Sequence, residues 1–148
     1  MSENAASRPP SAVLFACNFN RVRSPMAEAL LKRMMGDRVY VDSCGLKPSE
    51  DDVDPFVAEV MSEVGCDVAR HRPKTFDDLD DASFDLVISL TPHAHHRAVE
   101  MTRGRAVEIE YWPMLDPTLT EGSREARLTA YREVRDALTR ELLKRFSR

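Results

Sequence analysis

The chain has few cysteines, no long apolar run and no excess of positive charge, and each absence narrows its possible functions. No hydrophobic stretch approaches the roughly 20 residues that a membrane-spanning helix needs. The formal net charge of −4 argues against a nucleic-acid-binding surface. A chain with 3 cysteines and no export signal is typical of a reducing cytosol. Because the count is odd, at least one thiol is free. We therefore expect a cytoplasmic protein that binds neither membranes nor nucleic acid.

The length of 148 residues predicts a single domain with a substantial hydrophobic core. Residues 1–10 are polar, include two prolines and lack the apolar stretch of a signal peptide. We expect them to form a disordered N-terminal tail, followed by one domain over residues 11–148. Nothing in the sequence indicates an oligomeric state.

Strand-like and helix-like segments alternate along this domain. Short apolar runs predict strands, and segments that begin at serine or proline predict helices. The expected strands cover residues 13–16, 39–43, 86–90 and 106–111, and the expected helices cover residues 25–35, 54–64, 92–101 and 123–146. Ser24 is the expected N-cap of the first helix. This alternation predicts a three-layer α/β/α fold around a parallel sheet.

The segment from Cys17 to Pro25, C-N-F-N-R-V-R-S-P, is the most informative part of the chain. It joins a predicted strand to a predicted helix, at the sheet edge where α/β proteins bind ligands. Amides at a helix N-terminus bind anions, and Arg23 can hold two phosphoryl oxygens through its planar guanidinium. The same groups stabilise the thiolate of Cys17, and Ser24 can donate its hydroxyl to that sulfur. We expect the phosphate-binding loop to consist of Asn18, Phe19, Asn20, Arg21, Val22, Arg23 and Ser24.

Phosphoryl transfer also needs an acid that protonates the leaving oxygen. The sequence contains two candidate Asp-Pro pairs. Asp54-Pro55 is typical of a helix N-cap followed by a first-turn proline. Asp116-Pro117 follows the fourth predicted strand and lies at the same sheet edge as the loop. We therefore predict that Asp116 is the general acid.

The sequence predicts no metal and no cofactor. His93, His95 and His96 are close in sequence, and His93 and His96 share one helix face. No carboxylate or cysteine completes a convincing ligand set, so we expect a solvated helix surface there. Arg23 and the loop amides can carry the charge of the reaction without a metal.

From Val13 to the closing helix the chain resembles the low-molecular-weight protein tyrosine phosphatases. The resemblance rests on the loop and on the motifs Ser24-Pro25-Met26-Ala27-Glu28, Asp42-Ser43-Cys44-Gly45, His71-Arg72 and Asp116-Pro117. It implies a four-stranded parallel sheet in the order 2-1-3-4 and a cysteinyl-phosphate intermediate. It makes Cys17 the nucleophile, Arg23 the group that binds the transition state, and Asp116 the acid and then the base. It also implies that a hydrogen-bonded network supports the loop, formed by Asn20, Ser24, Ser43 and His71.

Several positions depart from that family. Phe19 replaces a small residue; it is strained if the position needs a positive φ, or its ring forms part of the pocket mouth. Asn20 suits a left-handed backbone turn. Val22 replaces a second cysteine, and Thr118 stands where an aromatic is frequent. Thr91 stands where an aspartate is frequent. We expect a phosphomonoester hydrolase, a protein tyrosine phosphatase by resemblance, acting on a phosphorylated protein or a small phosphate ester.

Two other functions stay open. Thioredoxin-coupled arsenate reductases resemble this fold and loop, but reduction needs further cysteines, typically just after the third strand. Residues 89–92 contain none, and we expect Cys44 to be a packing cysteine, although it could approach Cys17. The other alternative is a non-catalytic module that binds phosphate or a phosphoprotein. Because a binding module needs no acid, the presence of Asp116 together with Cys17 and Arg23 favours an enzyme.

Overall fold

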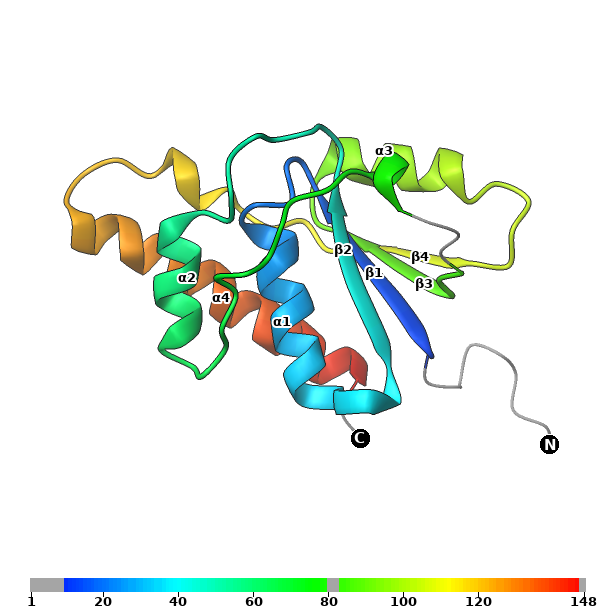
Figure 1. Ribbon diagram of the computed structural model, residues 1–148, viewed down its shortest axis with the longest axis horizontal. Coiled ribbons are helices and arrows are strands. Elements are labelled where there is room, and N and C mark those ends of the chain that lie inside the picture. Colours follow the sequence, from blue (N-terminus) through cyan, green and yellow to red (C-terminus); the bar gives the residue numbers. More distant parts are fainter. Residues whose placement is uncertain (1–9, 80–82, 147–148) are drawn as a thin grey trace.

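Four parallel strands form one sheet in the order β2-β1-β3-β4 (Figure 1). Their bounds are Ala12–Cys17 for β1, Tyr40–Gly45 for β2, Leu86–Ser89 for β3 and Glu108–Tyr111 for β4. The computed structural model describes residues 10–79 and 83–146, so residues 1–9 of the predicted tail lie outside the described residues. The predicted α/β fold and the strand order 2-1-3-4 are confirmed.

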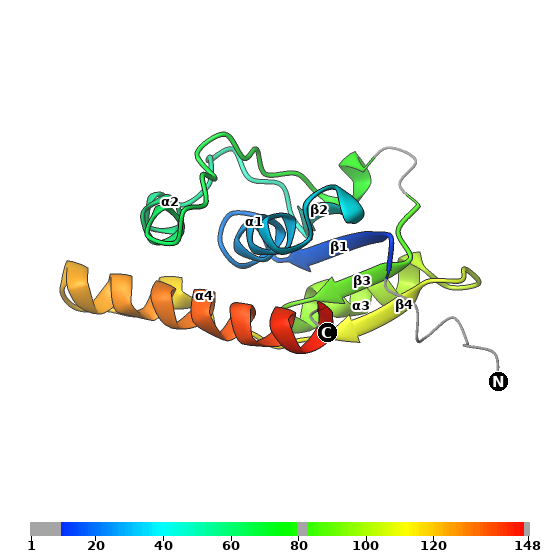
Figure 2. The ribbon, with the colours of Figure 1, turned by 90° about the horizontal axis from the view of Figure 1, so that it is seen from below.

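Helices cover both faces of this sheet. The α-helices are α1 at Arg23–Met35, α2 at Pro55–Ser62, α3 at Pro92–Met101 and α4 at Arg124–Phe146. Short 3-10 helices are η2 at Gly36–Arg38, η3 at Phe76–Asp78 and η4 at Pro117–Leu119. Figure 2 shows α4 running lengthwise beneath α1 and α2. In Figure 1, α1, α2 and α4 lie on one side of the strands and α3 lies on the other, as a three-layer fold requires.

The side chains of β1 divide between two hydrophobic cores because successive residues of a strand point to opposite faces. Phe15 and Cys17 belong to the core that α1, α2 and α4 cover. Ala16 belongs to the core that α3 covers. Cys44 is the partner of Ala16 in the parallel register and lies in that second core. The thiols of Cys17 and Cys44 therefore lie on opposite faces of the sheet.

The predicted elements are all present, with ends that differ by a few residues. The first helix begins at Arg23, and its N-cap is Val22, which makes no side-chain capping hydrogen bond. The prediction that Ser24 caps this helix is therefore wrong, because its hydroxyl contacts Cys17 and Asn20 instead. Asp54 does cap α2, as predicted, since its Oδ1 accepts a hydrogen bond of 2.9 Å from the Phe56 amide.

The long closing helix buries the predicted apolar face against α1 and α2. Its buried side chains include Leu128, Tyr131, Val134, Leu138 and Leu142. Burying each large apolar side chain contributes about 1.5–3 kcal/mol, so this face anchors α4 beneath α1 and α2. Among the residues that the structure describes, no helix is long and apolar enough to cross a membrane.

Candidate active site

The loop between β1 and α1 surrounds a cavity of about 220 Å³. Cys17 ends β1 with only 2% of its surface exposed, and it lines this cavity with Arg21, Arg23 and Asp116. Its Sγ lies 2.9 Å from Ser24 Oγ. The structure therefore brings the predicted nucleophile, the predicted arginine and the predicted acid to one pocket.

Arg23 lies at the base of this cavity, where 8% of its surface is exposed. Its Nη1 donates a hydrogen bond of 3.1 Å to the Met114 carbonyl, which fixes the plane of the guanidinium. Its Nε is buried and has no hydrogen-bond partner among the described residues. An unpaired buried donor costs about 1–3 kcal/mol. This donor is suited to an oxyanion held above the loop.

Asp116 faces Arg23 across the cavity, with Oδ2 3.8 Å from Arg23 Nη2. The carboxylate is the N-cap of η4. Its Oδ1 accepts hydrogen bonds from the Thr118 amide at 3.0 Å and the Thr118 hydroxyl at 2.6 Å. One oxygen is therefore held by η4, while the other is directed toward the cavity.

Asn20 is the centre of the network that supports the loop. It is fully buried and has a positive φ of 59°, in the left-handed conformation predicted for it. Its Nδ2 donates to Ser24 Oγ at 2.8 Å and to Ser43 Oγ at 2.9 Å. Its Oδ1 accepts from the Lys74 amide at 3.0 Å and lies 3.0 Å from His71 Nε2. The structure thus brings the four predicted support residues together.

This network also limits the hydrogen-bonding roles of Ser24 and His71 beside the loop. Ser24 Oγ accepts from Asn20, and its own hydrogen faces two acceptors, Cys17 Sγ at 2.9 Å and the Cys44 carbonyl at 3.4 Å. Burial lowers the pKa of His71, so the imidazole is neutral near pH 7. Both Asn20 oxygens near His71 Nε2 are acceptors, so the neutral ring carries its hydrogen on Nε2.

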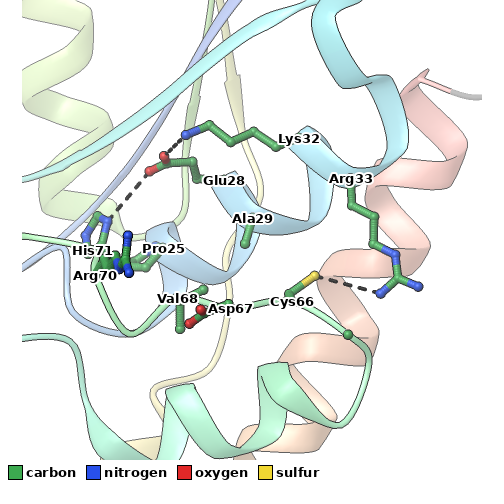
Figure 3. A pocket seen from close by; sticks show the side chains of 11 residues that line it. Pro25, Glu28, Ala29, Lys32, Arg33, Cys66, Asp67, Val68, Arg70 and His71 are labelled. Carbon is green, nitrogen blue, oxygen red and sulfur yellow. Dashed lines mark hydrogen bonds and ion pairs between the residues drawn. The ribbon is translucent and has the colours of Figure 1, made fainter.

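Glu28 extends the network behind the loop, which the sequence analysis missed. Its Oε1 accepts a hydrogen bond from Ser43 Oγ and lies 3.9 Å from His71 Nδ1. Figure 3 shows Glu28 on α1, between His71 and Lys32, beside a second cavity of about 530 Å³. The only signal in the sequence was the place of Glu28 in the Ser24–Glu28 motif, which assigns no contact.

Two further residues shape the loop from neighbouring elements. Thr91 caps α3 and donates a hydrogen bond of 2.8 Å to Asn18 Oδ1, so a residue noted only as a departure holds the loop. Gly45 ends β2 directly beneath Phe19, where an added Cβ would lie 2.7 Å from the Phe19 carbonyl carbon. The close approach of these two backbones requires glycine at this position.

Phe19 is not strained by a left-handed backbone. Among the described residues other than glycine, the positive φ belongs to Asn20 alone, so the first of the two expectations for Phe19 is wrong. Its side chain is 48% exposed and lines the cavity, so the ring forms part of the mouth. Thr118 lines the same cavity, and Phe19 is its one aromatic within the described residues.

The cysteines are free thiols, and each is buried. Burial raises the pKa of Cys44, and the nearby Cys17 raises it further, so the Cys44 thiol stays protonated. Cys66 lines the second cavity, where Arg33 Nη1 lies 3.9 Å from its sulfur (Figure 3). Within the described part of the chain, no group of three or more His, Cys, Asp or Glu side chains is arranged to hold a metal ion.

Known proteins with this fold carry names for more than one reaction. The sequence profile of the low molecular weight phosphotyrosine protein phosphatases matches residues 12–147. The arsenate reductase of Bacillus licheniformis is 32% identical over 135 residues, which cover 91% of this chain and 94% of that protein. An arginine phosphatase from Geobacillus stearothermophilus has a similar solved structure, with a TM-score of 0.73, 26% identity and coverage of 92% and 90%. The low molecular weight protein tyrosine phosphatase of T. tengcongensis gives a TM-score of 0.72 at 25% identity, with coverage of 91% and 96%.

Proposed function

Because the chain belongs to the low molecular weight phosphotyrosine protein phosphatase family, we propose that it hydrolyses phosphate monoesters through a covalent intermediate on Cys17. The observation that carries the proposal is the carboxylate of Asp116, which shares one cavity with Cys17 and lies 3.8 Å from Arg23. A carboxyl group at this place can give a proton to the leaving oxygen. A site that only binds phosphate needs no such group.

In the first step the Cys17 thiolate attacks phosphorus, an S–P bond forms and the ester P–O bond breaks. Asp116 gives its proton to the departing oxygen, so the leaving group departs as a neutral alcohol or phenol. Arg23 and the loop amides bind the three remaining phosphoryl oxygens, whose charge grows in the transition state. The unpaired Nε of Arg23 supports this assignment because it supplies a donor that the protein itself does not use.

In the second step the Asp116 carboxylate takes a proton from water, and the resulting hydroxide equivalent attacks phosphorus. The S–P bond breaks, phosphate leaves and the thiolate of Cys17 is restored. Ser24 donates a hydrogen bond to the departing thiolate, from which its oxygen is 2.9 Å away. Asn20, Ser43 and His71 are positioning residues in this proposal, since they act through the loop.

Reduction of arsenate is the second candidate, and it is favoured by several relatives named arsenate reductase, among them the Bacillus licheniformis protein. The Cys17 thiolate would attack arsenate and form an S–As bond with loss of water. A second thiol would then attack the Cys17 sulfur, form a disulfide and leave the electron pair of the S–As bond on arsenic as arsenite. Cys44 is poorly suited to that step because it is protonated and lies on the opposite face of the sheet. Cys66 lines the second cavity and not the cavity of Cys17. The second thiol would therefore have to come from a small thiol or another protein.

One set of assays separates these candidates. We expect wild-type protein to turn over p-nitrophenyl phosphate and Cys17→Ser to lose that activity while still binding phosphate. Arsenate consumption is measured with glutathione and, separately, with thioredoxin, in wild type and in Cys44→Ser. Arsenate reduction without ester hydrolysis would overturn the phosphatase proposal. A flat ester trace, no arsenite and tight phosphate binding would instead indicate a binding module.

A further inference from the structure

A second arginine lines the reaction cavity beside Arg23. Arg21 is half-buried whereas Arg23 is buried, so Arg21 lies nearer the mouth of the 220 Å³ cavity. Its Nε donates a hydrogen bond of 2.7 Å to the Asp52 carbonyl. Among the described residues, no carboxylate oxygen lies within 4.0 Å of its guanidinium. The cavity therefore carries a positive charge that neither the loop nor Asp116 neutralises.

The structure holds this arginine in place from two sides. The Arg21 carbonyl accepts a hydrogen bond of 3.2 Å from the Asp54 amide. Asp54 is itself fixed, because its Oδ2 accepts a hydrogen bond of 2.7 Å from the Tyr131 hydroxyl on α4. With its backbone and its Nε both bound, Arg21 loses little further freedom when its terminal nitrogens bind a ligand.

The base of the cavity already supplies the donors that a phosphoryl group needs, from Arg23 and the loop amides. The leaving group of a bound ester extends from the phosphoryl group past Asp116 toward the mouth of the cavity, where Phe19 and Arg21 line the wall. Building on the proposed phosphatase activity, we propose that Arg21 selects phosphate monoesters whose leaving group carries a second negative charge. A carboxylate matches the planar donor pair of a guanidinium. That charge belongs either to an acidic residue next to a phosphorylated side chain or to a carboxylate of a small ester.

A purely structural role for Arg21 predicts a different outcome. If Arg21 only fixes the Asp52 carbonyl, its replacement weakens the binding of all esters to the same extent. If it binds the leaving group, its replacement weakens the binding of esters with a charged leaving group more than the binding of esters with a neutral leaving group. Arg21→Gln removes the charge and keeps a side-chain donor for the Asp52 carbonyl, so it separates these roles.

The test measures binding to the Cys17→Ser protein by calorimetry, in buffer without phosphate. The probes are phenyl phosphate and 4-carboxyphenyl phosphate, which differ by one carboxylate. We expect the carboxylated ester to bind about 3–10-fold tighter, the range of a partly exposed charged pair. Adding Arg21→Gln should bring this ratio close to 1, and any loss of affinity for the phosphoryl group itself cancels in the ratio because both esters share it. Raising the ionic strength should shrink the preference in the same direction.

The matched control is Arg103→Gln, which removes an exposed charge after α3 and away from this cavity, and should leave the ratio unchanged. A second pair of probes, phosphotyrosine peptides with Asp or Asn beside the phosphotyrosine, distinguishes a protein substrate from a small ester. If Arg21→Gln changes the affinity ratio of the two aryl esters and not that of the two peptides, the substrate is a small ester and not a protein.

Equal affinities of the two aryl esters for Cys17→Ser, or a preference that survives Arg21→Gln, would overturn the role of Arg21. Turnover of p-nitrophenyl phosphate by wild type is measured separately and tests the phosphatase proposal. Because the binding ratio needs no catalysis, the two proposals can fail independently.

Discussion

Replacing Asp116 with asparagine removes a proton donor and leaves the geometry of its loop intact. Asp116 Oδ1 accepts hydrogen bonds from the Thr118 amide and hydroxyl, and the amide oxygen of asparagine can accept the same two. The asparagine NH₂ group then takes the place of Oδ2, 3.8 Å from Arg23 Nη2. The change isolates proton donation from the position of η4.

A positioned general acid contributes about 10²–10⁴-fold to the rate, or about 3–5 kcal/mol. We expect Asp116→Asn to lower kcat/KM for phenyl phosphate by an amount in this range, because kcat/KM reports the step in which the leaving group departs. Dinitrophenyl phosphate, whose leaving group needs no proton, should lose less than about tenfold in kcat/KM. The slope of log kcat/KM against the pKa of the leaving phenol measures the difference. Equal losses for both esters would refute the assignment of Asp116 as the acid.

Thr118→Val is the control for this experiment, because it keeps the carboxyl group and removes one of its hydrogen bonds. One such bond is worth about 1 kcal/mol, so a loss of about fivefold is expected. The dependence on the leaving group should remain close to that of wild type. A loss as large as that of Asp116→Asn would mean that orientation, and not proton donation, explains both variants.

Three other predictions concern the loop and its support. Arg23→Lys should lower kcat/KM about 100-fold or more, because lysine lacks the paired donors that bind two oxygens; steady-state kinetics measure this, and a loss below tenfold would contradict it. Asn20→Ala leaves several buried partners unpaired, and should cost about 3 kcal/mol and lower Tm by roughly 6–12 °C in calorimetry. Because burial lowers the pKa of His71, the unfolded chain takes up that proton first as the pH falls below about 6.5. The unfolding free energy from urea titrations should decline below that pH and be less pH-dependent in His71→Gln; an unchanged slope would contradict this.

The fold was predictable because its signals are local. Apolar runs such as Val13–Ala16 end at turn residues, and the apolar face of the closing helix repeats with helical spacing. The end of the first helix was predictable from Gly36, whose φ of 57° favours glycine. Its beginning was not, because Ser24 has the chemistry of an N-cap but its hydroxyl is used by Cys17 and Asn20. Tertiary contacts decided between two uses of the same side chain.

Part of the site was likewise predictable from a local motif, and part of it depends on contacts between distant segments. The loop from Cys17 to Ser24 is continuous in sequence, so its chemistry was visible as a motif. The contacts of Glu28 with Ser43 and of Thr91 with Asn18 join separate elements. No periodicity encodes such pairs, because each depends on how the strands and helices are placed.

The two candidate reactions share their first step and differ in what the second step requires. Hydrolysis needs a carboxylate that activates water, and Asp116 lies in the cavity of Cys17. Reduction needs a second thiol at the same sulfur, whereas the Cys44 thiol belongs to the core on the other face of the sheet. The chain itself thus holds a group for the second step of hydrolysis, and a reductase would have to take its second thiol from outside. Arsenate also has no extended leaving group, so a charge preference at Arg21 has a use only if the substrate is an ester.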